Sequence, residues 1–337
     1  MRVASACVIL VVLSIAAYAT WTQTRVPAAI RQMVVAGPAP TTGQSPAIAP
    51  AARTAAQAPA PTLAAAPPPV TPIPTCNNPD ALGLTRVVEI DTTNGPGFGY
   101  EHFKMHDFLR QGEVVLTFDD GPWPGHTPAV LKALAEHCIK ATFFPIGKHA
   151  TYYPDILKQV AEAGHTVGSH TWGHKDLSRK PYSENLDLAK EEIEKGISAV
   201  RMAIGTPGAP FFRFPALKHP PEMVTYLGER NIGIFSTDFD SFDFTMRKPE
   251  QVVKSVMTKL EKRGKGIILM HDFQQHTAEA LPEILRQLKA GGYKIVHLKP
   301  KEPVATLAQY DEAVAKEVKL PTVSDRPTSS VVRTISE

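Results

Sequence analysis

The stretch VVLTFDDGPWPGHTP, Val114–Pro128, decides the interpretation of the fold. Its first five residues have the apolar character of a buried strand, and two adjacent aspartates, Asp119 and Asp120, follow directly. Two neighbouring carboxylates repel each other when both are buried and ionised. Taken alone, the stretch could be an Asp-Gly turn with exposed carboxylates, so the rest of the sequence has to explain the pair.

Apolar strands alternate with helices on the C-terminal side of this stretch. The predicted strands are 113–118, 141–147, 165–170, 210–214, 232–238, 265–270 and 293–298. The predicted helices are 127–138, 152–164, 183–203, 220–231, 248–264 and 277–292, with Thr127 and Ser183 as N-caps of the first and third. This alternation predicts an α/β fold with about seven parallel strands, and short strands buried on both faces suit a barrel at least as well as an open sheet.

Charge is distributed unevenly along the chain. Residues 1–75 hold four arginines and no acidic residue, whereas the remainder has 32 basic and 33 acidic side chains. The patterned part is therefore nearly neutral and has no basic stripe for phosphate, which argues against a nucleic-acid partner.

The N-terminal segment predicts export. Residues 1–24 contain an apolar run, Val3–Ala19, that is equally consistent with a cleaved signal peptide and with an uncleaved membrane anchor. Either one directs the chain to the periplasm or cell envelope, and we expect membrane contact only through this segment. Residues 25–80 are rich in Ala and Pro and predict a disordered linker, residues 81–300 the catalytic domain, and residues 301–337 a partly disordered tail.

The chain has three cysteines, Cys7, Cys76 and Cys138. Export permits a disulfide between Cys76 and Cys138. Because Cys138 lies in an apolar helical pattern, we interpret it as a buried free thiol.

Polar side chains of a hydrolytic site follow the predicted strands. In parallel α/β folds such side chains meet where strands end and loops begin. They are Asp119, Asp120, His170, His174, Arg213, Asp240, Asp243, His271 and Asp272.

The segment HTWGH offers two imidazoles, His170 and His174, four residues apart, which can share a face on a helical turn and bind one metal ion. A carboxylate from the Asp119–Asp120 pair completes three protein ligands and leaves an open position for water, the arrangement of catalytic zinc. A divalent cation, which we expect to be Zn²⁺, neutralises one aspartate, so that its neighbour can stay ionised and act as a base.

The segments TFDDGP, TPAVL, ATFFPIG, HTWGH, RFP, DSFDF and ILMHD, in this order, resemble the polysaccharide deacetylases of carbohydrate esterase family 4, the NodB-homology domain. The resemblance covers about Glu113 to Leu298. It implies a distorted (β/α) barrel that removes N- or O-acetyl groups from polysaccharides with a divalent metal, usually zinc.

The resemblance also implies roles for individual residues. Asp119 matches the general base, and the metal ligands are Asp120, His170 and His174. His271 matches the general acid.

Supporting positions follow from the same resemblance. Asp243 matches the residue that orients the acid, in preference to Asp238 or Asp240, and Arg213 matches the residue that holds the base. Leu269 matches a residue of the acetyl-methyl pocket. The backbone N–H near Ala216 is the expected oxyanion donor.

Two features depart from the family pattern. The segment RFPAL lacks the aromatic residue and the glycine of the family's Arg-Pro-Pro-Tyr-Gly-like segment, and Phe244 replaces a tryptophan in the substrate wall. Trp123 and Trp172 lie beside motifs, and stacking on sugars and packing at the rim are equally consistent with their positions.

We therefore expect a metal-dependent deacetylase acting on a cell-envelope polysaccharide or oligosaccharide. N-acetylglucosamine of peptidoglycan is the first substrate to test, with chitin oligomers and acetylated xylan as alternatives. Two rival functions share the same residues. One is a non-catalytic glycan-binding module of the same fold, and the other is an Fe(II) enzyme with a two-His-one-carboxylate site.

Overall fold

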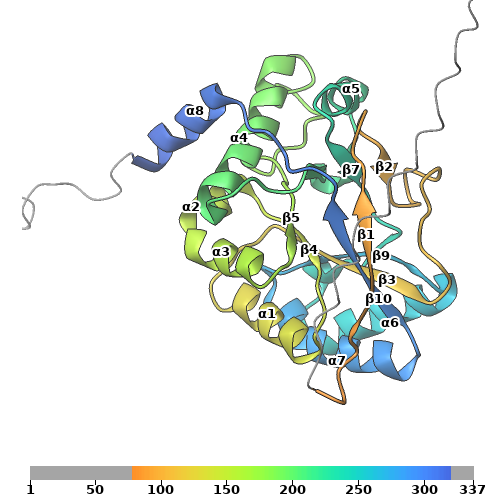
Figure 1. Cartoon of the computed structure of the whole chain (residues 1–337). Helices are drawn as coiled ribbons and strands as arrows, with labels where there is room; N and C mark the ends of the chain where they lie inside the picture. Colours follow the sequence, from red (N-terminus) through yellow and green to blue (C-terminus); the bar gives the residue numbers. More distant parts are fainter. Residues whose placement is uncertain (1–77, 320–337) are drawn as a thin grey trace, which may run out of the picture. The chain divides into compact units, whose positions relative to one another are not determined.

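The computed structural model describes residues 78–319 (Figure 1). The predicted signal or anchor and nearly all of the predicted linker lie outside these residues. Among the described helices, none combines the length and the apolar character that crossing a membrane requires.

Seven parallel strands form the larger sheet, and its central strand carries the paired aspartates. The strands are β1 (Leu84–Ile90), β3 (Glu113–Asp119), β4 (Thr142–Phe144), β5 (Thr166–Val167), β8 (Phe239–Asp240), β9 (Gly266–His271) and β10 (Lys294–Pro300). β3 pairs with β9 along one edge, while its other edge pairs first with β10 and then with β4. Every residue of β3 is buried, because strands flank it on both sides.

A second, three-stranded parallel sheet completes the ring. Its strands are β2 (Gly97–Phe98), β6 (Phe211–Phe212) and β7 (Gly233–Phe235), in the order β2-β7-β6. A bridge between Ser169 and Phe212 joins the region after β5 to β6. The two sheets form a distorted α/β barrel, which confirms the fold class predicted from the sequence. The hydrophobic pattern did not predict β1, β2 or β8.

Helices surround the strands (Figure 1). They are α1 (His126–Glu136), α2 (Gly147–Tyr152), α3 (Pro154–Glu162), α4 (Leu186–Ile204), α5 (Pro221–Glu229), α6 (Pro249–Arg263), α7 (Gln275–Ala290) and α8 (Ala308–Lys319). Two short 3-10 turns, η1 (Pro215–Leu217) and η2 (Asp243–Thr245), follow β6 and β8.

Helix starts differ from the predicted caps. Asn185, not Ser183, caps α4, and its side chain accepts hydrogen bonds from the backbone N–H groups of Asp187 and Leu188. Helix α1 begins at His126 after Gly125, so Thr127 lies inside the first turn. Its hydroxyl instead accepts from the Trp123 N–H at 2.8 Å.

Part of the predicted tail is ordered, because residues 308–319 form α8, which packs beside α4 with Val314 fully buried and Lys195 paired to Glu317 (Figure 1). The free-thiol interpretation of Cys138 is wrong, because this half-buried residue is disulfide-bonded. Its partner lies outside the described residues.

Candidate metal centre and active site

A cavity of about 530 Å³ opens at the carboxyl ends of the strands. The expected site residues among its lining are Asp119, Asp120, His170, His174, Ala216, Phe244, Leu269 and His271. Two more, Arg213 and Asp243, lie directly behind this lining as hydrogen-bond partners of Asp119 and His271. The topology therefore brings together residues that are up to 152 positions apart in the sequence.

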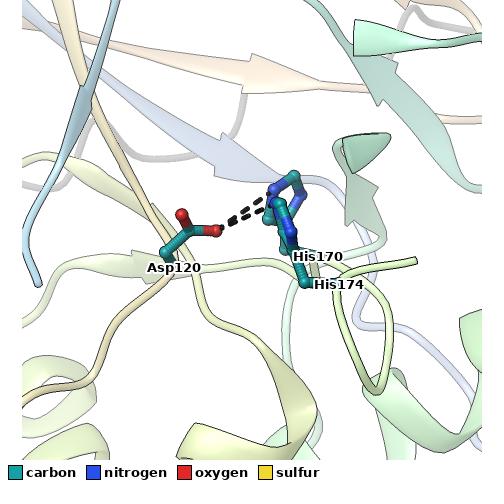
Figure 2. A group of neighbouring side chains, drawn as sticks. All are labelled: Asp120, His170 and His174. Atoms are coloured by element: carbon teal, nitrogen blue, oxygen red, sulfur yellow. Dashed lines mark ion pairs between the residues drawn. The ribbon is translucent and has the colours of Figure 1, made fainter. Parts of the chain in front are cut away.

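Three side chains converge on one point in the cavity. Asp120 Oδ1 lies 3.5 Å from His170 Nε2 and 3.3 Å from His174 Nε2. Figure 2 shows this carboxylate oxygen directed toward both imidazoles. One ligand atom from each of the three residues lies within 4.8 Å of the others. Asp120 adopts φ 71°, a left-handed conformation that aspartate tolerates better than most residues.

The chemistry of these three side chains fits a divalent cation. Asp120 Oδ1 is buried and has no hydrogen-bond partner among the described residues, a costly state unless a cation compensates it. His170 Nδ1 lies 2.7 Å from the Arg213 carbonyl oxygen, which fixes the N–H on Nδ1 and leaves Nε2 as the ligand atom. Burial, with His174 nearby, lowers the pKa of His170 well below its usual value, so the ring is neutral, as a ligand must be.

Asp119 has a different environment from its neighbour. It is 2% exposed, and its Oδ1 accepts a 2.7 Å hydrogen bond from Arg213 Nη1. Its other oxygen, Oδ2, lies 3.9 Å from His170 Nε2, beside the three-residue cluster. Burial raises the pKa of Asp119 to about 6, although the charge of Arg213 opposes this. This carboxylate can accept a proton near neutral pH.

Arg213 is fully buried and rigidly held. Its Nε and Nη2 donate to the carbonyl oxygens of Phe235 and Ser236 at 3.0 and 2.9 Å, and Nη1 also donates to Thr117 Oγ1 at 2.8 Å. The guanidinium stacks 4.4 Å above the Phe144 ring. With all three guanidinium nitrogens hydrogen-bonded, Arg213 fixes the position of the Asp119 carboxylate.

His271 and Asp243 form a second buried pair beside the cluster. His271 Nδ1 lies 2.6 Å from Asp243 Oδ1, while the His271 N–H and Thr277 Oγ1 donate to Asp243 Oδ2 at 2.7 and 2.6 Å. Burial disfavours the charged imidazole, but the hydrogen bond and charge of Asp243, with further acidic neighbours, raise the pKa of His271 to about 10. Its Nε2 lies 3.9 Å from Asp120 Oδ2 and carries a proton available to the cavity.

Asp272 supports the aspartate loop from behind, a role that the sequence did not indicate. Its Oδ1 accepts from the Gly121 N–H at 3.1 Å, and its Oδ2 accepts from Thr127 Oγ1 at 2.5 Å. A Cβ on Gly121 would lie 2.2 Å from Asp272 Oδ2, so glycine is required for this close approach. These contacts fix the backbone just after Asp120.

Glu192 of α4 supports the loop that carries both histidines. Its backbone carbonyl accepts from the Trp172 N–H at 2.7 Å, and its side-chain Oε2 accepts from the Gly173 N–H at 2.8 Å. Loop and helix approach closely at Gly196, where a Cβ would lie 2.6 Å from the Thr171 carbonyl carbon. Thr277, Asp272 and Glu192 all act through partners distant in sequence, so no local motif marks them.

The two tryptophans do not line the cavity. Trp172 is 7% exposed and packs in the core beneath Lys195, so the sugar-stacking interpretation is wrong for it. Trp123 packs edge-on against His149 and Tyr153, which corresponds to the rim-packing interpretation. Phe244 does face the cavity and packs edge-on against His271 at 5.4 Å between ring centroids.

The turn after Arg213 is strained. Ala216 and Leu217 are consecutive residues with φ 52° and 53°, and both line the cavity. The N–H groups of Leu217 and Lys218 donate to Phe214 and Pro215 carbonyls. Ala216 is therefore the residue of this turn whose N–H we consider as an oxyanion donor.

Comparison with known proteins gives one consistent result. A family model described as polysaccharide deacetylase matches residues 109–232. A chitooligosaccharide deacetylase of Sinorhizobium fredii is 31% identical over 213 residues, which are 57% of this chain and 96% of that protein. A peptidoglycan-N-acetylglucosamine deacetylase of Listeria monocytogenes is 34% identical over 186 residues, 54% of this chain but only 37% of that longer protein.

A solved structure is also similar. The structure of a peptidoglycan deacetylase from Bdellovibrio bacteriovorus matches with a TM-score of 0.58 and 34% identity, over 65% of this chain and 59% of that chain. At this identity the likeness extends beyond the fold.

Proposed function

Because this chain belongs to the polysaccharide deacetylase family, we propose that it hydrolyses N-acetyl groups of N-acetylglucosamine units in a cell-envelope glycan. Peptidoglycan is the substrate we favour, since relatives named for peptidoglycan and for chitooligosaccharides are both similar to this chain and we expect its N-terminal segment to direct export. The observation that carries the proposal is one cavity in which Asp119 and His271 each lie within 3.9 Å of a side chain of the Asp120–His170–His174 cluster.

Asp120, His170 and His174 would hold a divalent cation, which we propose to be Zn²⁺. When bound, such an ion supplies positive charge for the carbonyl oxygen of the acetyl group and acidifies a coordinated water molecule. The side chains around the ion carry out the proton transfers of the reaction.

Asp119 acts as the base. The pKa of this carboxyl is about 6, so it is mostly ionised at neutral pH, and its Oδ2 faces the cluster while Arg213 occupies Oδ1. It removes a proton from the attacking water as the new carbon–oxygen bond forms. The Ala216 N–H is the proposed donor to the developing oxyanion.

His271 acts as the acid. Asp243 holds its Nδ1–H, so the imidazolium presents Nε2–H to the leaving nitrogen. Proton transfer from Nε2 accompanies cleavage of the carbon–nitrogen bond, and acetate and a free amine are the products. Leu269, 4% exposed at the cavity wall, is the proposed contact of the acetyl methyl group.

The direct test is acetate release by the full chain, supplied with Zn²⁺, from peptidoglycan and N-acetylglucosamine oligomers. We expect release by the wild type and at least a 100-fold loss in Asp119→Asn, which removes the base but keeps the side-chain size. Asp187→Asn, at an exposed position of α4, is the matched control and should be fully active. Absence of acetate from every acetylated glycan, with the metal bound, would favour a glycan-binding module instead.

A further inference from the structure

An aromatic side chain that the proposed mechanism does not use lies at the edge of the cavity. Phe242 is 48% exposed and lines the cavity beside Phe244. It does not belong to any of the three hydrophobic clusters of the described residues. A large, half-exposed ring at a cavity wall is available for binding rather than for packing the core.

The backbone of Phe242 is held in an unfavourable conformation. Its φ of 57° is unusual for a bulky residue. Its N–H donates to Asp240 Oδ1 at 2.7 Å, and its carbonyl accepts from the N–H and the hydroxyl of Thr245 at 3.0 and 2.7 Å. These contacts fix the backbone that carries the ring before any ligand binds, which lowers the entropic cost of binding to it.

One face of the Phe242 ring is already covered. Lys259 Nζ lies 4.4 Å from the ring centroid and is itself held by the Asp240 carbonyl oxygen at 2.7 Å. Nearly half of Phe242 remains exposed beside this contact. An aromatic face with a fixed backing is a suitable surface for the apolar C–H face of a sugar ring.

The position of Phe242 relative to the acid defines which sugar it can reach. Phe244 packs against His271 at 5.4 Å, and Phe242 packs against Phe244 at 6.0 Å between centroids. Phe244 therefore contacts both the acid and Phe242, and among the described residues no ring contact joins Phe242 to His271 itself. A sugar whose acetyl group is at His271 lies near Phe244, and Phe242 is the neighbouring aromatic surface for the sugar linked to it.

We propose that the exposed face of Phe242 is a stacking subsite for the pyranose ring linked to the sugar that is deacetylated. Asp240, whose carboxylate holds the Phe242 N–H, also lines the cavity and supplies a polar group for the hydroxyls of that second sugar. This inference rests on the proposed function. It predicts a preference for oligomers over a single N-acetylglucosamine.

The test compares chain lengths and variants of the full, Zn²⁺-supplied protein. For Phe242→Ala we expect the ratio of kcat/KM on tetra-N-acetylchitotetraose to kcat/KM on N-acetylglucosamine to fall about tenfold, mainly through KM of the tetramer. Alanine keeps a non-glycine residue at the same backbone position, so the change isolates the ring. Phe242→Trp should restore the ratio, and Tyr152→Ala, which removes an exposed aromatic outside the cavity, should leave it at the wild-type value.

Binding separates this inference from the proposed function. In the Asp119→Asn background, calorimetry should show that adding Phe242→Ala weakens tetramer binding about tenfold. This comparison decides the subsite even if no protein releases acetate, a result that would overturn the proposed function alone. Equal affinities with and without Phe242→Ala, or no tetramer binding at all, would overturn the subsite.

Discussion

Asp119 and Asp120 are adjacent in sequence, but their side chains have different partners. Asp119 pairs with the buried guanidinium of Arg213, whereas Asp120, in a left-handed conformation, faces the imidazoles of His170 and His174. A cation at the cluster would complete the charge balance. The carboxylates of Asp119 and Asp120 can then lie side by side at the end of β3 without repelling each other, and each has a separate role.

The Asp243–His271 pair makes the clearest prediction at this scale. In metal-free protein, Asp243→Asn should lower the pKa of His271 from about 10, because burial disfavours the imidazolium and the hydrogen bond and charge of Asp243 no longer oppose it. Histidine titration by NMR measures this shift. We also expect at least a 100-fold loss of deacetylation at neutral pH. An unchanged titration of His271 in the variant would contradict the assigned pairing.

The same pair affects stability with a definite sign. A histidine whose folded pKa is raised stabilises the fold fully below its unfolded pKa of 6.5 and loses this contribution as the pH rises through about 10. Unfolding of the metal-free protein should therefore become easier across this range. Asp243→Asn should reduce the pH dependence there.

The residues that could be predicted from the sequence are those in compact motifs. His170 and His174 are four positions apart, and Asp119 and Asp120 follow a recognisable strand. The supporting roles of Asp272 and Glu192 could not be predicted in this way, because their partners are the backbone N–H groups of Gly121 and Gly173, 151 and 19 positions away. A supporting hydrogen bond to the main chain leaves no trace in side-chain patterns.

At the scale of elements, α4 connects the histidine loop to the rest of the barrel. Glu192 on this helix holds the loop, and Glu194, fully buried, accepts from Tyr226 Oη at 2.7 Å and from Arg230 Nε at 2.8 Å on the side of α5. Helix α4 therefore supports the histidine loop through Glu192 and contacts the region of α5 through Glu194.

We expect Glu194→Ala to lower the free energy of unfolding by about 3 kcal/mol, because it leaves the partly buried Arg230 without its counter-charge. Denaturant unfolding measures the loss. Glu191→Ala, on an exposed turn of the same helix, should cost far less. Similar losses of unfolding free energy in both variants would show that the buried Glu194–Arg230 pair stabilises the fold no more than the Glu191–Lys195 pair does.

Helices and strands could be predicted from the sequence where their hydrophobic pattern extends over many residues. The periodicity of α4, α6 and α7 and the apolar runs of β3 and β9 are strong signals. Strands of two residues such as β2 and β8 carry no period to detect. Helix α8 was missed because its buried face is narrow and is defined only by packing on α4.

At the scale of the whole molecule, buried histidines away from the site should limit acid stability. Burial lowers the pKa of His165 to about 3 and of His297 to about 4. Between these values and 6.5 the unfolded chain binds protons that the folded chain does not, so stability falls as the pH falls. His297→Gln should reduce this slope by up to about 1.4 kcal/mol per pH unit, as measured by unfolding between pH 4 and 6.5. An unchanged slope would contradict this account.

Metal binding should also stabilise the whole fold. At a Zn²⁺ concentration about 100 times Kd, we expect a gain of about 2.7 kcal/mol, visible as a higher Tm. His174→Ala should abolish most of the Zn²⁺-dependent increase while changing the metal-free Tm little, because this side chain is 41% exposed. The same increase in the variant would place the binding ion elsewhere.

The most direct test of the central claim is an anomalous-scattering map from a crystal of the Zn²⁺-supplied protein. The account predicts one strong peak about 2.0–2.2 Å from Asp120 Oδ1, His170 Nε2 and His174 Nε2, with Asp119 and His271 next to it. No peak at these three atoms, or a peak bound by other residues, would contradict it.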